Sequence, residues 1–136
     1  MKKLIVLLIA ILTLTACATP GTDTVEFNVE MRDFSFVPET VEVRVGQTVR
    51  VNVLNKGNIE HDWAIMEIPL ASKAKVADTT SMLHSHEDKE PAIHVSAIPG
   101  AKNTVEFIPT RAGIYEVYCT LKGHKEQGMV GKLVVK

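Results

Sequence analysis

Cysteine, histidine and methionine follow one another at equal intervals near the C-terminal end of the sequence. Cys119 is followed by His124 and then by Met129, with four residues in each interval. A thiolate, an imidazole and a thioether on one loop form a mixed set of soft sulfur and nitrogen donors. One Cys, two His and a weakly bound Met make up a blue-copper site, so the loop predicts a copper centre that still needs one histidine.

His61 is the candidate for that histidine. It follows the turn signal Asn55-Lys56-Gly57 and opens an apolar segment that predicts a strand over His61–Ile68. In a β-sandwich, the start of this strand can lie beside the Cys119 loop. A purely structural explanation stays open for each of the four candidates. Cys119 would be an inert buried thiol, Met129 core packing, His124 an ordinary exposed loop histidine, and His61 a histidine that binds no metal.

Apolar and polar residues alternate with a period of two over most of the chain after residue 24, and many of the apolar ones are β-branched. Seven or eight short strands of this kind predict an all-β antiparallel sandwich. The predicted strands cover residues 25–31, 41–45, 49–53, 61–68, 104–108, 114–119 and 132–135. Segment 71–100 lacks clean alternation, so we expect a long loop there, or a short helix over Ser72–Leu83.

The composition limits the classes of protein that fit. The chain has 136 residues and a formal net charge of −1, with 46% hydrophobic and 23% charged residues. These values are typical of one small globular domain with one core and exclude a disordered chain. A nucleic-acid-binding protein would carry a basic excess, so we expect no nucleic acid partner.

These motifs resemble those of the cupredoxins, the small blue copper proteins that include plastocyanin, azurin and auracyanin. The resemblance rests on residues 53–57, on His61-Asp62-Trp63, on residues 112–119, and on His124 and Met129, and the equal spacing is most like that of the auracyanins. It implies a Greek-key β-sandwich and an exposed His124 through which electrons enter and leave. It also implies one copper ion with four ligands: His61, Cys119, His124 and Met129.

Asp62 departs from the family, which usually has Asn after the first histidine. In the family that Asn bridges to the segment bearing the cysteine, so we expect Asp62 and Thr120 to brace the ligands from outside. An ionised Asp62 can accept a hydrogen bond from Thr120; the alternative is that burial keeps Asp62 protonated. Backbone N–H groups near Cys119, including that of Thr120, are expected to donate to the sulfur.

A leader precedes the β-rich part of the chain. Lys2 and Lys3 come before the apolar run Leu4–Leu12, which is too short to span a bilayer. Leu14-Thr15-Ala16-Cys17 resembles the lipobox of bacterial lipoproteins, in which the leader is removed and the cysteine carries lipid. We therefore expect an extracytoplasmic protein, anchored to a bacterial cell membrane through Cys17 and facing the periplasm or the cell surface. The predicted parts are a signal peptide at 1–16, a tether at 17–24 and a cupredoxin domain at 25–136.

Together these features predict a monomeric one-electron carrier that is not an enzyme and whose partners are redox proteins, such as a cytochrome or a membrane redox complex. The alternative is an extracytoplasmic copper-binding or chaperone lipoprotein without a role in electron transfer. A binuclear copper domain would need a second cysteine in the loop, and a cysteine hydrolase would need a residue that orients its histidine. A separate group in an acidic stretch predicts either a second metal site or a solvated loop: His84, His86 and His94.

Overall fold

The structure is a computed structural model that describes residues 23–77 and 89–136. The predicted signal peptide, Cys17, His84 and His86 lie outside these residues, as does most of the predicted tether. None of the described residues forms a helix that is long and apolar enough to cross a membrane.

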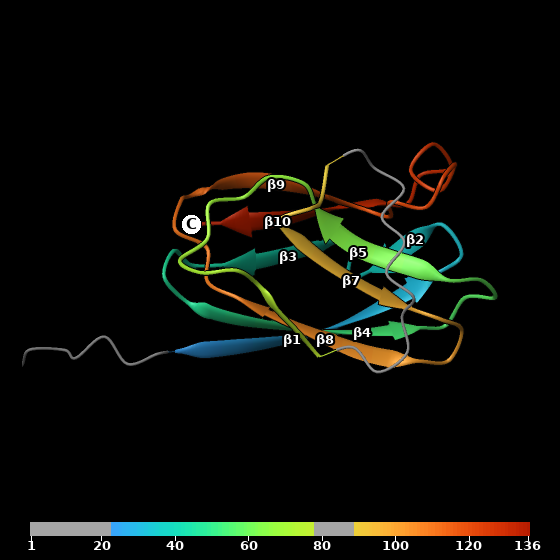
Figure 1. Ribbon diagram of the computed structural model, residues 1–136, viewed down its shortest axis with the longest axis horizontal. Helices are drawn as coiled ribbons and strands as arrows, with labels where there is room; N and C mark the ends of the chain where they lie inside the picture. Colours follow the sequence, from blue (N-terminus) through green and yellow to red (C-terminus); the bar gives the residue numbers. More distant parts are fainter. Residues whose placement is uncertain (1–22, 78–88) are drawn as a thin grey trace, which may run out of the picture.

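The described residues form ten strands in two five-stranded sheets that pack face to face (Figure 1). The strands of the first sheet are, in spatial order, β2 (Ser35–Val37), β1 (Thr24–Arg32), β4 (Thr48–Asn55), β8 (Lys102–Phe107) and β6 (Lys75–Ala77). Those of the second are β3 (Thr40–Val43), β10 (Val130–Val135), β9 (Gly113–Tyr118), β5 (His61–Ile65) and β7 (Ile93–Ala97).

The core lies between the sheets and follows from the alternation in the sequence. In β4, Val49, Val51 and Val53 are fully buried, and the residues between them are only partly buried. Each buried aliphatic side chain of this size stabilises the fold by about 1.5–3 kcal/mol. Trp63 of β5 stacks on Phe107 of β8, with ring centroids 6.3 Å apart, and so joins the two sheets.

The prediction of an all-β sandwich is confirmed, but two of its details are wrong. The described residues contain ten strands rather than seven or eight, and both sheets are mixed rather than antiparallel. β1 pairs in parallel with β4, and β10 pairs in parallel with β3. The period of two shows which face of a strand is buried, but it does not show which strand lies beside it or in which direction.

Segment 71–100 also differs from the expectation of a loop or helix. Its described part contains β6 and β7, and residues 72–77 of the predicted helix are not helical. β7 is a core strand, in which Ile93, Val95 and Ala97 are buried. Residues 78–83 of the predicted helix lie outside the described residues.

One end of the sandwich gathers the segments with metal-binding side chains. β1, β4 and β9 end there, and β5 and β10 begin there, on the right in Figure 1. The connections that carry the candidate ligands and their neighbours, residues 33–34, 56–60 and 119–129, therefore meet at this end, beside the connection 98–101 between β7 and β8.

Candidate metal centre

His61, Cys119 and His124 come together at this end of the sandwich. Their donor atoms all lie within 4.8 Å of one another, and they are the one such group of three or more His, Cys, Asp or Glu side chains among residues 23–77 and 89–136. Nδ1 of His124 lies 3.2 Å from Sγ of Cys119 and 3.3 Å from Nδ1 of His61. The structure thus joins the cysteine loop to a histidine from a distant part of the chain.

Backbone hydrogen bonds hold the loop that follows β9. The N–H of Cys119 donates to the carbonyl of Met129 at 3.2 Å, and the N–H of Met129 donates to the carbonyl of His124 at 3.0 Å. The equal spacing in the sequence therefore closes into a compact loop. Met129 is fully buried and belongs to the hydrophobic core. Its role as the fourth ligand stays a prediction.

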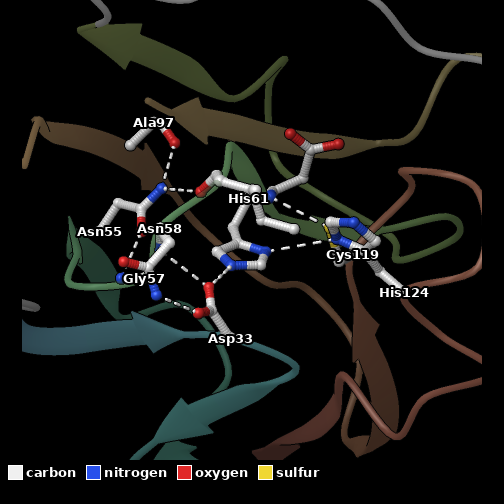
Figure 2. A network of polar contacts seen from close by, with 10 residues as sticks. Asp33, Asn55, Gly57, Asn58, His61, Ala97, Cys119 and His124 are labelled. Atoms are coloured by element: carbon white, nitrogen blue, oxygen red, sulfur yellow. Dashed lines mark hydrogen bonds and ion pairs between the residues drawn. The ribbon is translucent and has the colours of Figure 1, made fainter. Parts of the chain in front are cut away.

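The turn before His61 is ordered by the buried side chain of Asn55. Its Nδ2 donates to the carbonyls of Ile59, at 2.8 Å, and Ala97, at 2.7 Å, and its Oδ1 accepts from the N–H of Gly57 at 2.8 Å (Figure 2). These bonds link the end of β4 to the end of β7 and fix the path of the chain into β5. His61 opens β5, as the sequence predicts, and is fully buried.

Asp33 contacts His61 from the side opposite to the other donors, a contact that no motif in the sequence predicts. Oδ1 of Asp33 lies 3.2 Å from Nε2 of His61. Asn58 donates to the same carboxylate through its backbone N–H at 2.8 Å and its Nδ2 at 2.6 Å. These hydrogen bonds, from the Asn58 side chain first, then its backbone and His61, lower the pKa of Asp33. In the sequence, Asp33 has the character of an ordinary turn residue.

Phe34 packs against both histidines. Its ring meets that of His124 edge-on at 5.3 Å between centroids and that of His61 at 6.3 Å. Phe34 has a φ of 63°, in the left-handed region that bulky residues rarely adopt. The turn after β1 therefore brings one apolar ring and one carboxylate to the same pair of histidines.

Asp62 lies behind Cys119 and is buried. Its backbone N–H donates to Sγ of Cys119 at 3.3 Å. Its carboxylate accepts hydrogen bonds from the hydroxyl of Ser96, at 2.6 Å, and from that of Thr120. Burial by itself raises the pKa of Asp62, but hydrogen bonds from His94, Ser96 and Thr120 outweigh it and lower the pKa. The geometry therefore favours the ionised Asp62 over the protonated one.

His94, which the sequence groups with His84 and His86, is not a surface side chain. It lies in β7 with its side chain only 9% exposed, and its Nε2 is 3.3 Å from Oδ2 of Asp62. The strand alternation that would have shown this is short and is interrupted by polar residues. His84 and His86 fall outside the described residues.

The environment of the donors sets their protonation in the metal-free protein. Burial raises the pKa of the Cys119 thiol to about 11, although N–H groups of Asp62 and Leu121 act in the opposite direction. Asp62 and Leu121 therefore supply backbone donors at this sulfur, and the expected donor from Thr120 stays a prediction. Burial, and then the nearby His61, lower the pKa of His124. A metal ion must therefore displace the thiol proton, while the His124 imidazole is neutral and available near pH 7.

The donor set fits copper. Ligand nitrogen and sulfur atoms lie about 2.0–2.3 Å from a first-row metal ion, so donors 3.2 and 3.3 Å apart can contact the same ion. Thiolate and imidazole are the ligands that copper prefers at electron-transfer sites. His61, Cys119 and His124 would hold the ion, and Met129 would complete the predicted set.

Comparisons with known proteins agree with this geometry. The model of the cupredoxin-like domain family matches residues 4–135. The copper-resistant cuproprotein CopI of Rubrivivax gelatinosus is 37% identical over 101 residues, which are 74% of this chain and 59% of that protein. CopI of Pseudomonas aeruginosa is 26% identical over 137 residues, covering 79% of this chain and 74% of that protein.

This chain therefore spans less than two thirds of the length of the Rubrivivax protein. The solved structure of auracyanin A, a blue copper protein of Chloroflexus aurantiacus, superposes with a TM-score of 0.63 at 21% identity, covering 83% of this chain and 99% of that one. At this identity the likeness concerns the fold. With a family model that covers nearly the whole chain and a convergent Cys and two His, this chain belongs to the cupredoxin family and binds copper.

Proposed function

We propose that this protein is a mononuclear type 1 copper protein that carries single electrons between redox proteins outside the cytoplasm. The observation that supports this most directly is the convergence of His61 Nδ1, Cys119 Sγ and His124 Nδ1 in one compact group. Copper held there would supply a centre that gains and loses one electron.

The protein's own contribution is to hold the donors still. Cys119 and His124 lie on a loop that is closed by backbone hydrogen bonds, and His61 begins a buried core strand. A rigid set of donors changes little when the charge of the bound ion changes, which keeps electron transfer fast. His124 is only partly buried and serves as the contact for redox partners.

We further propose that the protein is not an enzyme. If Met129 is the fourth ligand, it occupies the position that a substrate or water would need. Met129 is fully buried between the loop and the core, which suits a side chain that excludes water from the centre. A pocket at this end of the molecule is lined by Tyr118 and loop residues 119–126, which suits the docking of a partner such as a cytochrome or a membrane redox complex.

The proposed location is the extracytoplasmic side of a bacterial cell membrane, facing the periplasm or the cell surface, with a monomeric domain tethered by lipid on Cys17. Acyl chains stabilise membrane binding by about 0.8 kcal/mol per buried CH₂, so several chains on one cysteine hold a protein firmly. Cys17→Ser should therefore move the protein from the membrane fraction to the soluble fraction. Retention of the variant in membranes washed with high salt would contradict the proposed anchor.

A second candidate function is copper binding for copper resistance, without electron transfer. It is favoured by the names of the two relatives, both copper-resistant cuproproteins. Such a protein would bind and pass on copper, and its donors would have to release the ion readily.

The experiment that tests the copper site is the addition of Cu(II) to the purified metal-free protein, followed by visible and electron spin resonance spectroscopy. We expect an intense thiolate-to-copper band that Cys119→Ser abolishes while the far-ultraviolet circular dichroism stays unchanged. Cys17→Ser is the matched control and should keep the band. A wild type without the band would overturn the proposal.

Kinetics distinguish the two functions. Stopped-flow mixing of the reduced protein with an oxidised c-type cytochrome should show fast electron transfer if the protein is a carrier. Slow electron transfer, together with rapid loss of Cu(I) to a chelator and a copper-sensitive deletion strain, would favour the resistance function.

A further inference from the structure

We propose that Asp33 is the positioning residue for His61: its carboxylate fixes the tautomer and the orientation of the ring that presents Nδ1 to the metal. The inference rests on the proposed function in taking His61 as a copper ligand. It adds a residue that lies outside the ligand set and 28 positions before His61 in the sequence.

The hydrogen-bonding roles follow from the chemistry of the two groups. An ionised carboxylate can only accept, so Nε2 of His61, 3.2 Å from Oδ1 of Asp33, must carry the proton. Nδ1 then keeps its lone pair. In Figure 2 the His61 ring lies between Asp33 on one side and His124 on the other, so that lone pair is directed at the other donors.

Asp33 is itself held in place. Asn58 donates to Oδ1 through its backbone N–H and to Oδ2 through its side chain, at 2.8 and 2.6 Å. The carboxylate therefore keeps its direction although the Asp33 side chain is 35% exposed. Its neighbour Phe34, with a φ of 63°, packs on both histidine rings, so the strained turn serves this contact.

Gly57 makes the contact sterically possible. A Cβ at this position would lie 2.3 Å from Oδ1 of Asp33 and 2.8 Å from Nε2 of His61, both closer than real side chains approach. Any other residue would force the carboxylate and the ring apart. The sequence has glycine where the pair requires it.

The consequence is a stronger preference for the more highly charged ion. A carboxylate that accepts from a metal-bound histidine raises the basicity of the ring, and its loss weakens metal binding by about 10- to 100-fold. The effect is larger for Cu(II) than for Cu(I), because the attraction grows with charge. If the loss of affinity is tenfold larger for Cu(II) than for Cu(I), the one-electron reduction potential rises by about 59 mV.

The test compares the full-length wild type with Asp33→Ala, Asp33→Asn and Gly57→Ala. Asp23→Asn is the matched control, since Asp23 is an exposed acid whose ion pair is with Arg44. ¹⁵N nuclear magnetic resonance of the metal-free proteins reports the tautomer of His61, and competition assays and voltammetry report Cu(II) affinity and potential. We expect the wild type and the control to carry the proton on Nε2.

In Asp33→Ala the tautomers should mix, Cu(II) affinity should fall about 10- to 100-fold and the potential should rise. Gly57→Ala should change all three readouts in the same direction, because it separates the pair without altering either residue. Asp33→Asn keeps an acceptor and should retain the tautomer but still raise the potential. If the thermal melt shows that Asp33→Ala does not fold, Asp33→Asn and Gly57→Ala test the positioning role of Asp33.

The inference would be overturned if Gly57→Ala and the folded Asp33 variants all showed the same His61 tautomer, Cu(II) affinity and reduction potential as Asp23→Asn. This outcome differs from failure of the proposed function. In that case the wild type lacks the thiolate-to-copper band, while the metal-free tautomer measurement still reports on the contact between Asp33 and His61.

Discussion

The carboxylate of Asp62 lies 3.3 Å from Nε2 of His94, between the paired strands β5 and β7. The same carboxylate accepts from the hydroxyls of Ser96 and Thr120, and the backbone N–H of Asp62 donates to Sγ of Cys119. Asp62 therefore contacts the cysteine sulfur through its backbone, while its carboxylate contacts three other side chains. The negative charge of the Asp62 carboxylate therefore acts on the charge at the metal site.

Asp62→Asn should raise the reduction potential by roughly tens of millivolts at neutral pH, because a nearby negative charge stabilises Cu(II) over Cu(I). The pKa of Asp62 is lowered, so the wild type should keep this charge, and a nearly constant potential, from pH 5 to 8. Voltammetry of both proteins from pH 4 to 8 checks this. Equal potentials throughout that range would mean that Asp62 is not charged in the copper protein.

Met129→Leu should retain copper and raise the potential, since the loss of a weak donor destabilises Cu(II) more than Cu(I). Met31→Leu is the matched control, because Met31 is equally buried but lies in β1. Both changes should cost less than about 1.5 kcal/mol of stability. Voltammetry that shows no difference between the two variants would assign Met129 to core packing.

The metal-free protein should lose stability as the pH rises above about 9. Burial raises the pKa of the Cys119 thiol from 9.0 to about 11, so between these values the unfolded chain is ionised and the folded one is not. The unfolded state then binds fewer protons, and the free energy of unfolding falls by about 1.4 kcal/mol per pH unit.

Cys119→Ser isolates this effect, because the other groups that titrate above pH 9 are common to both proteins. Urea unfolding at pH 8 to 11, with a chelator and a reductant present, gives the difference between wild type and variant. That difference should change only above about pH 9. A difference that is independent of pH would show that the folded thiol ionises as readily as the unfolded one.

Gly131→Ala should destabilise the fold by about 1–3 kcal/mol. A Cβ at residue 131 would lie 2.6 Å from the backbone carbonyl oxygen of Glu39, which also accepts from the N–H of Lys132 at the junction of β10 and β3. Gly113→Ala is the control, since its Cβ would only touch the Tyr115 ring at 3.4 Å. Thermal melts should separate the two variants; similar melting temperatures would mean that β10 can shift away from Glu39.

The sequence alone was sufficient for features that depend on neighbours along the chain. The equal spacing of Cys119, His124 and Met129 places all three on one loop, because so few residues cannot carry them far apart. The alternation of valines in segment 49–53 determines which of its side chains are buried, since successive residues of a strand point to opposite faces. These local rules predicted the sandwich and the cysteine loop.

The contacts between residues that are distant in the sequence depend on how the strands pair and the sheets stack. His61 and His124 are 63 positions apart, and only the packing of β5 beside β9 brings their rings together. Asp33 reaches His61 from the other sheet, and His94 reaches Asp62 across a pairing that lies in a segment without clear alternation. A period of two specifies a face but no neighbour, so these contacts exist only once both sheets have formed and packed.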